Sequence, residues 1–437
     1  MKLYKRNHYL EKIRPFYDDE LIKVITGIRR CGKSCLMASI VEELKERGVP
    51  KENIAYIDLE KHGYKSVKTT DQLEDAIEDA FNTGKIQEHS KSQDKIKEQQ
   101  IQPIEQDFDP NASLKYLFID EVQNVKYFET VLSAYIADGG FSIFITGFNS
   151  YLLSGELMTK LTGRYIEFEM FSLSFSEYLG MKHFLAKEIK DKRTEFEDYL
   201  RYGGFPQSLN YDDIDAKAHY IEGVVNQIIE KDIKARKKIR NFNMFERVMT
   251  YIINNYGATF SLSNLVHYFN TVEKIPVQRR TIATYIELLL SAKILYKCQR
   301  FDLKSRKSLR GEEKYYLADP SIYFARNADI RLNYGPSLEN VLYLYLRSLG
   351  YKLAIGRIGK LECDFIARKH NNYAYVQVAL SIADKTTEDR EYRPFSKIAD
   401  NYPKYLFTLD PLLQKREGIR HLNLLDFMEN DMDLVFA

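Results

Sequence analysis

Gly27-Ile-Arg-Arg-Cys-Gly-Lys-Ser34 is the stretch of this chain that decides its fold. It matches the pattern Gly-x-x-x-x-Gly-Lys-Ser of a phosphate loop, in which the backbone wraps around an anion. The β-rich run Leu21–Ile25 precedes it and the helical pattern Cys35–Leu44 follows it, which is the strand, loop and helix order that the motif requires. The competing interpretation is a glycine turn with a solvated lysine. The context favours a nucleotide-binding core.

The residues expected to contact the nucleotide form one continuous run: Gly27, Ile28, Arg29, Arg30, Cys31, Gly32, Lys33, Ser34 and Cys35. The two glycines let backbone N–H groups and the N-terminus of the following helix point at phosphates. We expect Lys33 to reach the β- and γ-phosphate oxygens and the Ser34 hydroxyl to ligate Mg²⁺. The two arginines are predicted to be solvated or interface charges rather than phosphate ligands. ATP and Mg²⁺ are therefore the predicted cofactors.

An acidic pair follows a second apolar run. Leu117–Ile119 leads into Asp120 and Glu121. Asp120 is predicted to be a metal-ligating residue beside the Mg²⁺ coordination shell. Glu121 is predicted to be a catalytic residue that orients and deprotonates water. An Asp-Glu cap on a helix after a strand is the structural alternative. Together with Lys33 upstream, the pair favours ATP hydrolysis over nucleotide storage.

Two further residues are candidates for catalysis. Asn149 follows the run Phe141–Ile145 and is the candidate sensor of the γ-phosphate, with Ser150 and Thr146 as alternatives. An Asn-Ser helix cap explains the same pattern equally well. Arg164 precedes another β-rich run and could stabilise transition-state charge in its own site or a neighbour's. A surface salt bridge is its alternative.

The core is predicted to be α/β, with a parallel sheet flanked by helices, because short β-rich runs alternate with helix-period segments. These runs are Leu21–Ile25, Asn53–Ile57, Lys115–Ile119, Phe141–Ile145 and Tyr165–Phe168. The polar stretch 87–106, part of an insertion at about 85–112, is predicted to be a mobile surface excursion. A short solvated helix is the alternative, because Glu, Lys and Gln are good helix formers.

Bulk composition limits the possible classes. The 437 residues are 44% hydrophobic and 13% aromatic, which indicates a globular chain of two or three domains. The 64 Lys and Arg nearly balance the 62 Asp and Glu, so any basic face must be local. The four cysteines lack metal-ligand spacing, and two flank the phosphate loop, which favours a reducing compartment. No signal peptide or membrane-spanning run is evident, so we expect a cytoplasmic protein without a membrane contact.

The middle of the chain shows a helix-turn-helix order. Helical patterns at Met244–Ile253, Leu262–Phe269 and Gln278–Ala292 precede β-like runs at Ile294–Cys298 and Lys314–Leu317. A basic loop, residues 304–310, is expected to join these two strands as a wing. Residues 278–314 hold ten Lys or Arg against four Asp or Glu, a basic region that could neutralise DNA phosphates. A protein-interaction module or a solvated face explains this basic region equally well. A second basic run, residues 231–240, also fits a solvated face.

The C-terminal region has the residue order of a restriction-like metal site without its chemistry. Glu339 is expected to begin a helix and Asp364 to end a strand. An active site of this type needs Glu-x-Lys on the next strand, but the sequence there reads Gln377-Val-Ala379. An amide binds Mg²⁺ weakly and alanine offers no proton chemistry. The prediction is a nuclease-like scaffold without activity, unless Lys360 or Lys369 replaces the missing lysine.

Five runs carry a resemblance to a known family: GIRRCGKS, LFIDEVQN, ITGFNSYLLSGELMTKLTGRY, FSLSFSEYL and LRYGGFPQ. The chain resembles the bacterial and archaeal AAA+-related P-loop ATPases that bear a C-terminal domain of unknown function. The resemblance implies an AAA+-type core, a winged-helix middle and a C-terminal domain similar to restriction-endonuclease-like folds. It also implies a homo-oligomer, although a monomer with unshared sites stays open. The predicted divisions are residues 1–170 (ATPase core), 171–240 (helical lid or linker), 241–325 (winged helix) and 335–437 (inactive nuclease-like domain).

The predicted function is Mg²⁺-dependent ATP hydrolysis coupled to a DNA or protein partner, with DNA contacted through residues 278–314. A slow nucleotide-operated switch or scaffold without DNA is the first alternative. A DNA nuclease is the second, and the motif argument disfavours it.

Overall fold

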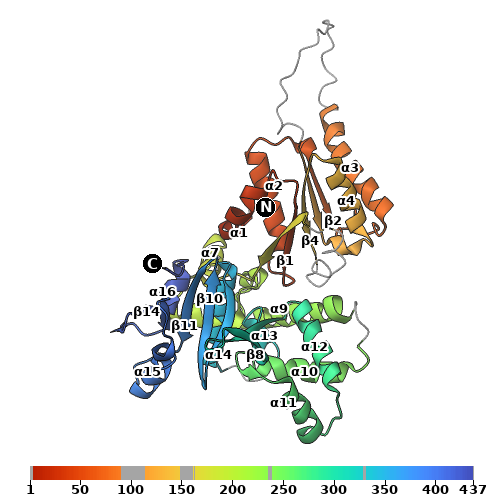
Figure 1. The fold of residues 1–437 in the computed structure, drawn as a ribbon. Coiled ribbons are helices and arrows are strands. Elements are labelled where there is room, and N and C mark those ends of the chain that lie inside the picture. The colour runs from red at the N-terminus through yellow and green to blue at the C-terminus, as the bar shows by residue number, and fades with distance from the viewer. Residues whose placement is uncertain are drawn as a thin grey trace, which may run out of the picture. The chain divides into compact units, whose positions relative to one another are not determined.

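The computed structural model describes residues 3–89, 114–147, 161, 163–234, 239–327 and 331–436 (Figure 1). Its contacts divide the chain into two compact units. The first comprises Met1–Gly27 and Gly32–Met170, and the second comprises Ile28–Cys31 and Phe171–Ala437. No helix in these described ranges has the length and apolar character needed to cross a membrane.

The first unit is built on a five-stranded parallel sheet with the strand order β2-β3-β4-β1-β5. Its strands are β1 (Ile22–Gly27), β2 (Ile54–Asp58), β3 (Lys115–Asp120), β4 (Phe141–Thr146) and β5 (Tyr165–Met170). All six residues of β1 are buried, as expected for a central strand of a parallel sheet that is covered on both faces. The predicted α/β fold class with a parallel core sheet is confirmed.

Helices cover this sheet. They are α1 (Asn7–Ile13), α2 (Lys33–Glu46), α3 (Thr70–His89) and α4 (Phe128–Asp138). α3 and α4 lie together against the sheet (Figure 1), where Leu73 and Ile77 of α3 join Ile57, Ile119 and Ile145 in one apolar core. The first residues of the predicted polar insertion, 85–89, form the end of α3, and the rest of the insertion lies outside the described residues.

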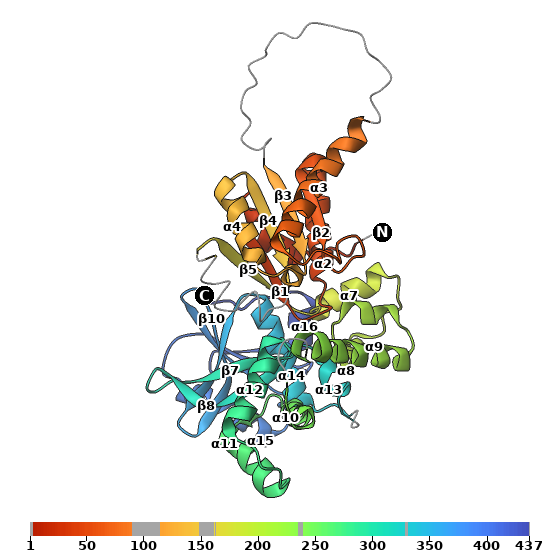
Figure 2. The ribbon, with the colours of Figure 1, turned by 90° about the vertical axis from the view of Figure 1, so that its right-hand side faces the viewer.

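The second unit contains a helical segment and a nine-stranded mixed sheet. Its helices are α7 (Phe175–Phe184), α8 (Lys192–Tyr202), α9 (Ile214–Gln227), the π-helix η5 (Ile228–Lys234), α10 (Phe242–Asn254), α11 (Leu262–His267), α12 (Arg279–Ser291), α13 (Ser321–Phe324), α14 (Tyr334–Ser348), α15 (Lys385–Tyr392) and α16 (Leu424–Glu429). Its strands are β6 (Thr259–Phe260), β7 (Leu295–Asp302), β8 (Lys307–Leu317), β9 (Lys352–Ile358), β10 (Leu361–Lys369), β11 (Asn372–Val378), β12 (Lys404–Thr408), β13 (Lys415–Arg416) and β14 (Ile419–Asn423). α8, α9 and α13 pack on one another (Figure 2).

Sequence-predicted elements of this unit differ from the structure in three places. The basic loop expected at residues 304–310 is short, because β8 already begins at Lys307 and pairs with Asp302 of β7. Glu339 lies inside α14 rather than at its start, and Asp364 lies inside β10 rather than at its end. At the first two places the element begins in polar or turn-forming residues, 307–311 and 334–337, which carry no apolar pattern.

The β7–β8 hairpin belongs to the C-terminal sheet. β7 pairs in parallel with β9, so the sheet runs in the order β13-β14-β12-β11-β10-β9-β7-β8-β6 without interruption. The strands expected as a separate wing therefore share one sheet with the strands of residues 335–437.

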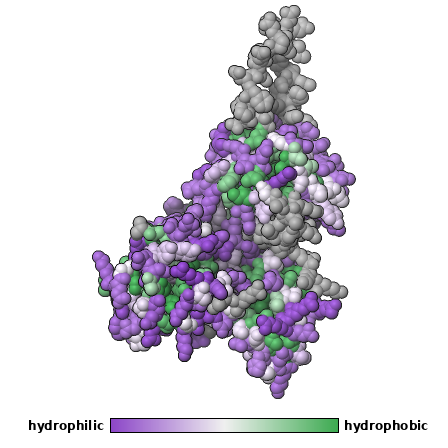
Figure 3. All heavy atoms as spheres, in the orientation of Figure 1, coloured by the Kyte–Doolittle hydropathy of each residue, from purple (hydrophilic) through white to green (hydrophobic). Residues whose placement is uncertain are grey.

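Surface composition gives little sign of a large apolar patch on the face seen in Figure 3. Hydrophilic residues cover much of its described part, and hydrophobic ones are interspersed among them. Isolated exposed apolar side chains of this kind are ordinary in folded proteins.

Lys23 is a buried amine in the central strand β1. Its Nζ donates to the backbone oxygen of Asp19 and to Ser142 Oγ, and it lies 4.6 Å from the centre of the Phe144 ring. Burial lowers its pKa to about 7, although Asp19 and Asp18 oppose this shift. The folded protein therefore holds a neutral amine at a pH where the unfolded chain is still protonated.

We expect the wild type to gain stability over Lys23→Met as the pH rises from 7 to 9. The unfolded state binds one proton more than the folded state in this window, so the difference in unfolding free energy should grow by up to about 1.4 kcal/mol per pH unit. Urea denaturation of both proteins at pH 7, 8 and 9 measures it. If the unfolding free energies of the wild type and Lys23→Met change with pH in parallel, the result would contradict the burial of this amine.

Candidate functional site

The phosphate loop connects β1 to α2. Gly27 has φ of 143° and Gly32 has φ of 106°, conformations that L side chains rarely adopt, so the glycines of the motif serve the turn itself. Lys33 opens α2 with its side chain buried, and its Nζ donates to the Gly27 backbone oxygen at 3.0 Å. The loop thus has a curved backbone with the lysine amine folded across it.

The acidic pair lies next to this loop because of the strand order. β4 lies between β1 and β3, so the carboxyl ends of these three parallel strands share one edge. Asp120 ends β3 and is 2% exposed. Ser34 lies near enough to Asp120 for its hydroxyl to lower the pKa of that carboxyl, and Tyr56 donates to Asp120 Oδ2 at 3.3 Å. The sheet thereby brings the two residues predicted to hold Mg²⁺ close together.

Thr146, the last residue of β4, connects both acidic residues. Its Oγ1 donates to Asp120 Oδ1 and accepts from the Glu121 backbone N–H at 3.0 Å. Glu121 has a left-handed backbone with φ of 57°, and its side chain accepts from Gln123 Nε2. The fully buried hydroxyl of Thr146 therefore orients both Asp120, the predicted Mg²⁺ ligand, and Glu121, the residue that follows it.

Thr146 was only an alternative to Asn149 in the sequence prediction. Asn149 and Ser150 lie outside the described residues, so their predicted role stays a prediction. The signal for Thr146 was its position as the last residue of a buried strand at the shared edge, which places its hydroxyl between the neighbouring strand ends.

Burial raises the pKa of Asp120, and hydrogen bonds from Ser34 and Thr146 partly oppose this shift. The cause is the poor solvation of a charge at the end of a buried strand. A divalent cation would stabilise that charge. Carboxylate and hydroxyl oxygens are the hard ligands that Mg²⁺ prefers, so the donor set of Ser34 and Asp120 fits this metal.

Arg164 lies at the opposite edge of the sheet. Tyr165 pairs with Ile22 at the start of β1, whereas Gly27 at its end pairs with Met170. The Arg164 backbone oxygen accepts from the Ile22 N–H. Six residues of strand, roughly 17 to 20 Å, separate the arginine from the loop of its own chain. The structure does not bring Arg164 together with Lys33 and Glu121.

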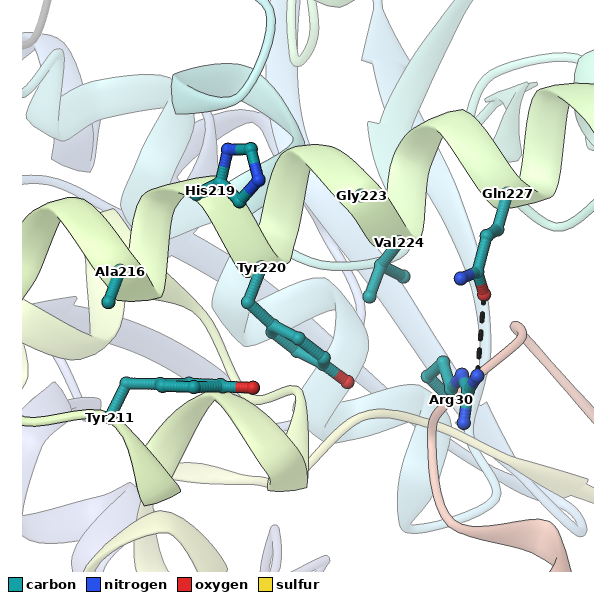
Figure 4. A pocket seen from close by; sticks show the side chains of 8 residues that line it. All are labelled: Arg30, Tyr211, Ala216, His219, Tyr220, Gly223, Val224 and Gln227. Atoms are coloured by element: carbon teal, nitrogen blue, oxygen red, sulfur yellow. Dashed lines mark hydrogen bonds between the residues drawn. The ribbon is translucent and has the colours of Figure 1, made fainter.

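The arginines of the loop have different environments. Arg29 is 7% exposed and forms an ion pair with Asp232, so it is a buried, paired charge rather than a solvated one. Arg30 is exposed and donates to Gln227 Oε1 at 3.4 Å. It lines a cavity of about 360 Å³ with Tyr211 and Tyr220 (Figure 4). The sequence had no signal for either partner, because both lie about two hundred residues away.

A second polar cluster lies in the nine-stranded sheet of the second unit. Lys314 of β8 is buried, and its Nζ lies 2.9 Å from Glu339 Oε2 and 3.0 Å from Glu362 Oε1. Burial opposes the charge of Lys314, but Glu339, Asp364 and Glu362 together raise its pKa. Burial also raises the pKa of Asp364, which Glu339 reinforces and Lys314 opposes. A lysine ammonium thus compensates the carboxylates.

Gln377 closes this cluster from β11. Its Oε1 accepts from the Asp364 N–H at 2.7 Å, and its Nε2 donates to Glu391 Oε2 at 2.8 Å. The two lysines that the sequence offered as replacements lie elsewhere: Lys369 pairs with Asp433, and Lys360 is exposed. The lysine that contacts the carboxylates is instead Lys314 of the β7–β8 hairpin. The Glu-x-Lys motif, which concerns a single strand, could not indicate it.

Comparison with known proteins identifies the family. Residues 19–179 match the AAA domain family, and residues 193–330 match a domain of unknown function. An uncharacterized protein of Haemophilus influenzae is 31% identical over 404 residues, with 92% of each chain covered. The chain belongs to the same family as that protein. It is an AAA-type, P-loop, ATPase-like protein.

Two further proteins are similar to this chain. An uncharacterized protein of Methanocaldococcus jannaschii is 27% identical over 389 residues, covering 86% of this chain and 78% of that protein. The Walker-type ATPase of Pyrococcus abyssi is similar in structure, with a TM-score of 0.50, 16% identity and coverage of 74% of this chain and 95% of that one. At this identity the likeness supports the fold alone.

We expect Lys314→Met to lower the free energy of unfolding by about 3 to 5 kcal/mol, because it leaves several carboxylates without their buried counter-charge. Lys297→Met is the matched control: Lys297 lies on the same hairpin in a more exposed pair with Glu313, so its loss should cost about 1 kcal/mol or less. Urea denaturation at pH 7.5 gives both values.

The loss of unfolding free energy caused by Lys314→Met should be smaller at pH 5 than at pH 7.5. Burial raises the pKa of Asp364, so protonation at lower pH removes the charge that Lys314 compensates in the wild type. Two results would contradict the role of Lys314 as a buried counter-charge. One is a loss of unfolding free energy equal to that of Lys297→Met, and the other is a loss that becomes larger as the pH falls.

Proposed function

We propose that this protein binds ATP with Mg²⁺ and hydrolyses it, and that the second unit couples turnover to a DNA or protein partner. The observation that carries the proposal is the shared edge of β1, β4 and β3, where Ser34 lies near Asp120 and Thr146 connects Asp120 to Glu121. It joins the phosphate loop to two acidic side chains at one sheet edge, which is where open α/β sheets bind ligands.

Each residue of this edge has a proposed role. The Lys33 amine, now on the Gly27 carbonyl, would move to the β- and γ-phosphate oxygens and compensate their charge. Ser34 and Asp120 would hold Mg²⁺, which supplies charge neutralisation at the transferring phosphate when bound. Glu121 would orient the attacking water and accept its proton. Its left-handed backbone and its N–H bond to Thr146 support a fixed orientation.

Two catalytic roles complete the proposal. Asn149 remains the proposed γ-phosphate sensor, on the grounds of its position after β4. Arg164 is proposed to serve the site of a neighbouring subunit, since the register of β1 and β5 keeps it from its own. This assignment requires a homo-oligomer in which one edge of each sheet faces the opposite edge of the next.

We propose that α10, α11 and α12 with the β7–β8 hairpin act as a winged helix that binds the partner. The helix order and the antiparallel hairpin support this assignment. The basic region 278–314 is less available than its composition suggested, because Lys297, Arg300 and Lys314 form ion pairs with glutamates. The remaining cations support a DNA contact of modest charge, and a protein partner fits the same surface.

The nuclease-like part is proposed to be a scaffold without cleavage activity. Lys314 already compensates the carboxylates that a metal would need, and Gln377 stands where a catalytic carboxylate would stand. Glu339 and Asp364 therefore support architecture rather than hydrolysis.

The first test is ATP turnover of the wild type, Lys33→Ala and Glu121→Gln, each with and without duplex DNA. We expect Lys33→Ala to lose ATP binding, and Glu121→Gln to bind ATP while its kcat falls by about a hundredfold or more. Lys45→Ala is the matched control, since Lys45 is an exposed lysine on the same helix α2. It should turn over like the wild type.

The pattern of results separates the alternatives. Stimulation by DNA supports the DNA-coupled ATPase, and turnover indifferent to DNA favours a protein partner. Slow turnover with tight ATP binding favours the nucleotide-operated switch. Equal ATP binding and turnover in all four proteins would show that the phosphate loop is not the nucleotide site.

We expect no cleavage of duplex or single-stranded DNA by the wild type with Mg²⁺ or Mn²⁺, because no catalytic lysine and carboxylate pair is available on β11. Gel assays with the wild type and Asp364→Ala measure this. Metal-dependent cleavage that survives Lys33→Ala and disappears in Asp364→Ala would establish the nuclease alternative.

A further inference from the structure

The tip of the phosphate loop belongs to the second unit. Residues Ile28–Cys31 group with that unit, although Gly27 before them and Gly32 after them group with the first. Ile28, Arg29 and Cys31 are all buried. The segment that must wrap around the phosphates therefore packs against residues far along the chain.

Arg29 provides the strongest contact of this segment. Its Nε and Nη2 both donate to Asp232 Oδ1 at 3.1 Å, and Nε also lies 3.4 Å from Oδ2. The two side chains are 7% and 3% exposed. A guanidinium that makes two bonds to one carboxylate is fixed in position and in plane, and burial makes the pair costly to break.

Arg30 adds a second contact with the same helical segment. It donates to Gln227 at the end of α9 (Figure 4). Its φ of 68° is a left-handed conformation that a non-glycine residue adopts only when its surroundings impose it. The backbone of the loop is thus held in a strained shape by two neighbouring side chains.

Asp232 itself is held firmly. It belongs to the π-helix η5, which continues α9 directly, and Ile228, Ile229 and Ile233 of the same segment are buried. π-Helical turns are rare and occur frequently at functional sites. The buried side chains of this segment anchor the backbone that carries Asp232, and Asp232 in turn holds Arg29.

We infer that Asp232 is a positioning residue for the phosphate loop: through Arg29 it keeps the loop in the shape that receives phosphate. This inference rests on the proposed ATP site and deepens it, since it makes nucleotide affinity depend on η5. A partner that moves η5 would change ATP binding through one ion pair. The chain itself transmits the effect, because Arg29 lies between Gly27 and Lys33.

A purely structural pair would behave differently. If Arg29 and Asp232 only stabilise the fold, removing both charges together relieves the cost of an unpaired buried charge and restores a normal loop. If they position the loop, the double variant recovers stability without recovering the loop.

The experiment compares Asp232→Ala, Arg29→Ala and the double variant with the wild type. Glu230→Ala is the matched control, because Glu230 lies on the same η5 segment and pairs with Lys234 on the surface. The first measurement is amide hydrogen exchange of residues 24–37 without nucleotide. The second is the Kd of Mg-ATP with the kcat at saturating ATP, and the third is the Tm.

We expect exchange in residues 24–37 to quicken by about tenfold or more in all three variants, and the Kd of Mg-ATP to rise by a similar factor. At saturating ATP the kcat should change by less than about threefold, since bound ATP restores the loop. Glu230→Ala should match the wild type throughout. The double variant should regain Tm over Asp232→Ala but keep the fast exchange and the weak binding.

The inference is overturned if the double variant returns to wild-type exchange and Kd, or if Asp232→Ala matches Glu230→Ala. Should Asp232→Ala alone fail to fold, the double variant carries the test, because it buries no unpaired charge. Should the wild type bind no ATP, the proposed function fails, and the exchange data still decide whether Asp232 holds the loop.

Discussion

Parallel pairing of β1 between β4 and β5 is the constraint on which the candidate site depends. It directs the carboxyl ends of all five strands to one edge, where Gly27, Asp120 and Thr146 end three adjacent strands. None of these residues is near the others in the sequence. The hydrogen bonds of Thr146 with Asp120 and Glu121, and the closeness of Ser34 to Asp120, exist because that pairing brings these residues together, and a shift of register would separate them.

Local patterns were sufficient to predict the core. Short apolar runs identify the central strands because β1, β3 and β4 are buried on both faces, and the phosphate loop is recognisable because its glycines serve positive φ angles. The acidic pair could be assigned because it ends a strand. The contacts of Thr146 with both acidic residues could not be predicted from sequence, since they depend on which strand lies between β1 and β3.

Contacts between distant elements are what the sequence could not provide. Arg29 meets Asp232, and Lys314 meets Glu339 and Glu362, through packing of helices and strands whose order no motif encodes. Both cations looked like surface charges, Arg29 because it stands in a polar loop and Lys314 because it stands in a basic run. Each is buried, so a count of basic residues overstated the positive surface of the second unit.

The hydrogen bonds between β7 and β9 limit where this chain can be cut into separate fragments. A cut between α13 and α14 would leave β7 on one fragment and β9 on the other, each with a newly bare row of amide and carbonyl groups. Open edges of this kind recruit other strands and promote aggregation. The hairpin and the C-terminal strands therefore form one cooperative folding unit, and they are expected to have been inherited together rather than exchanged as separate modules.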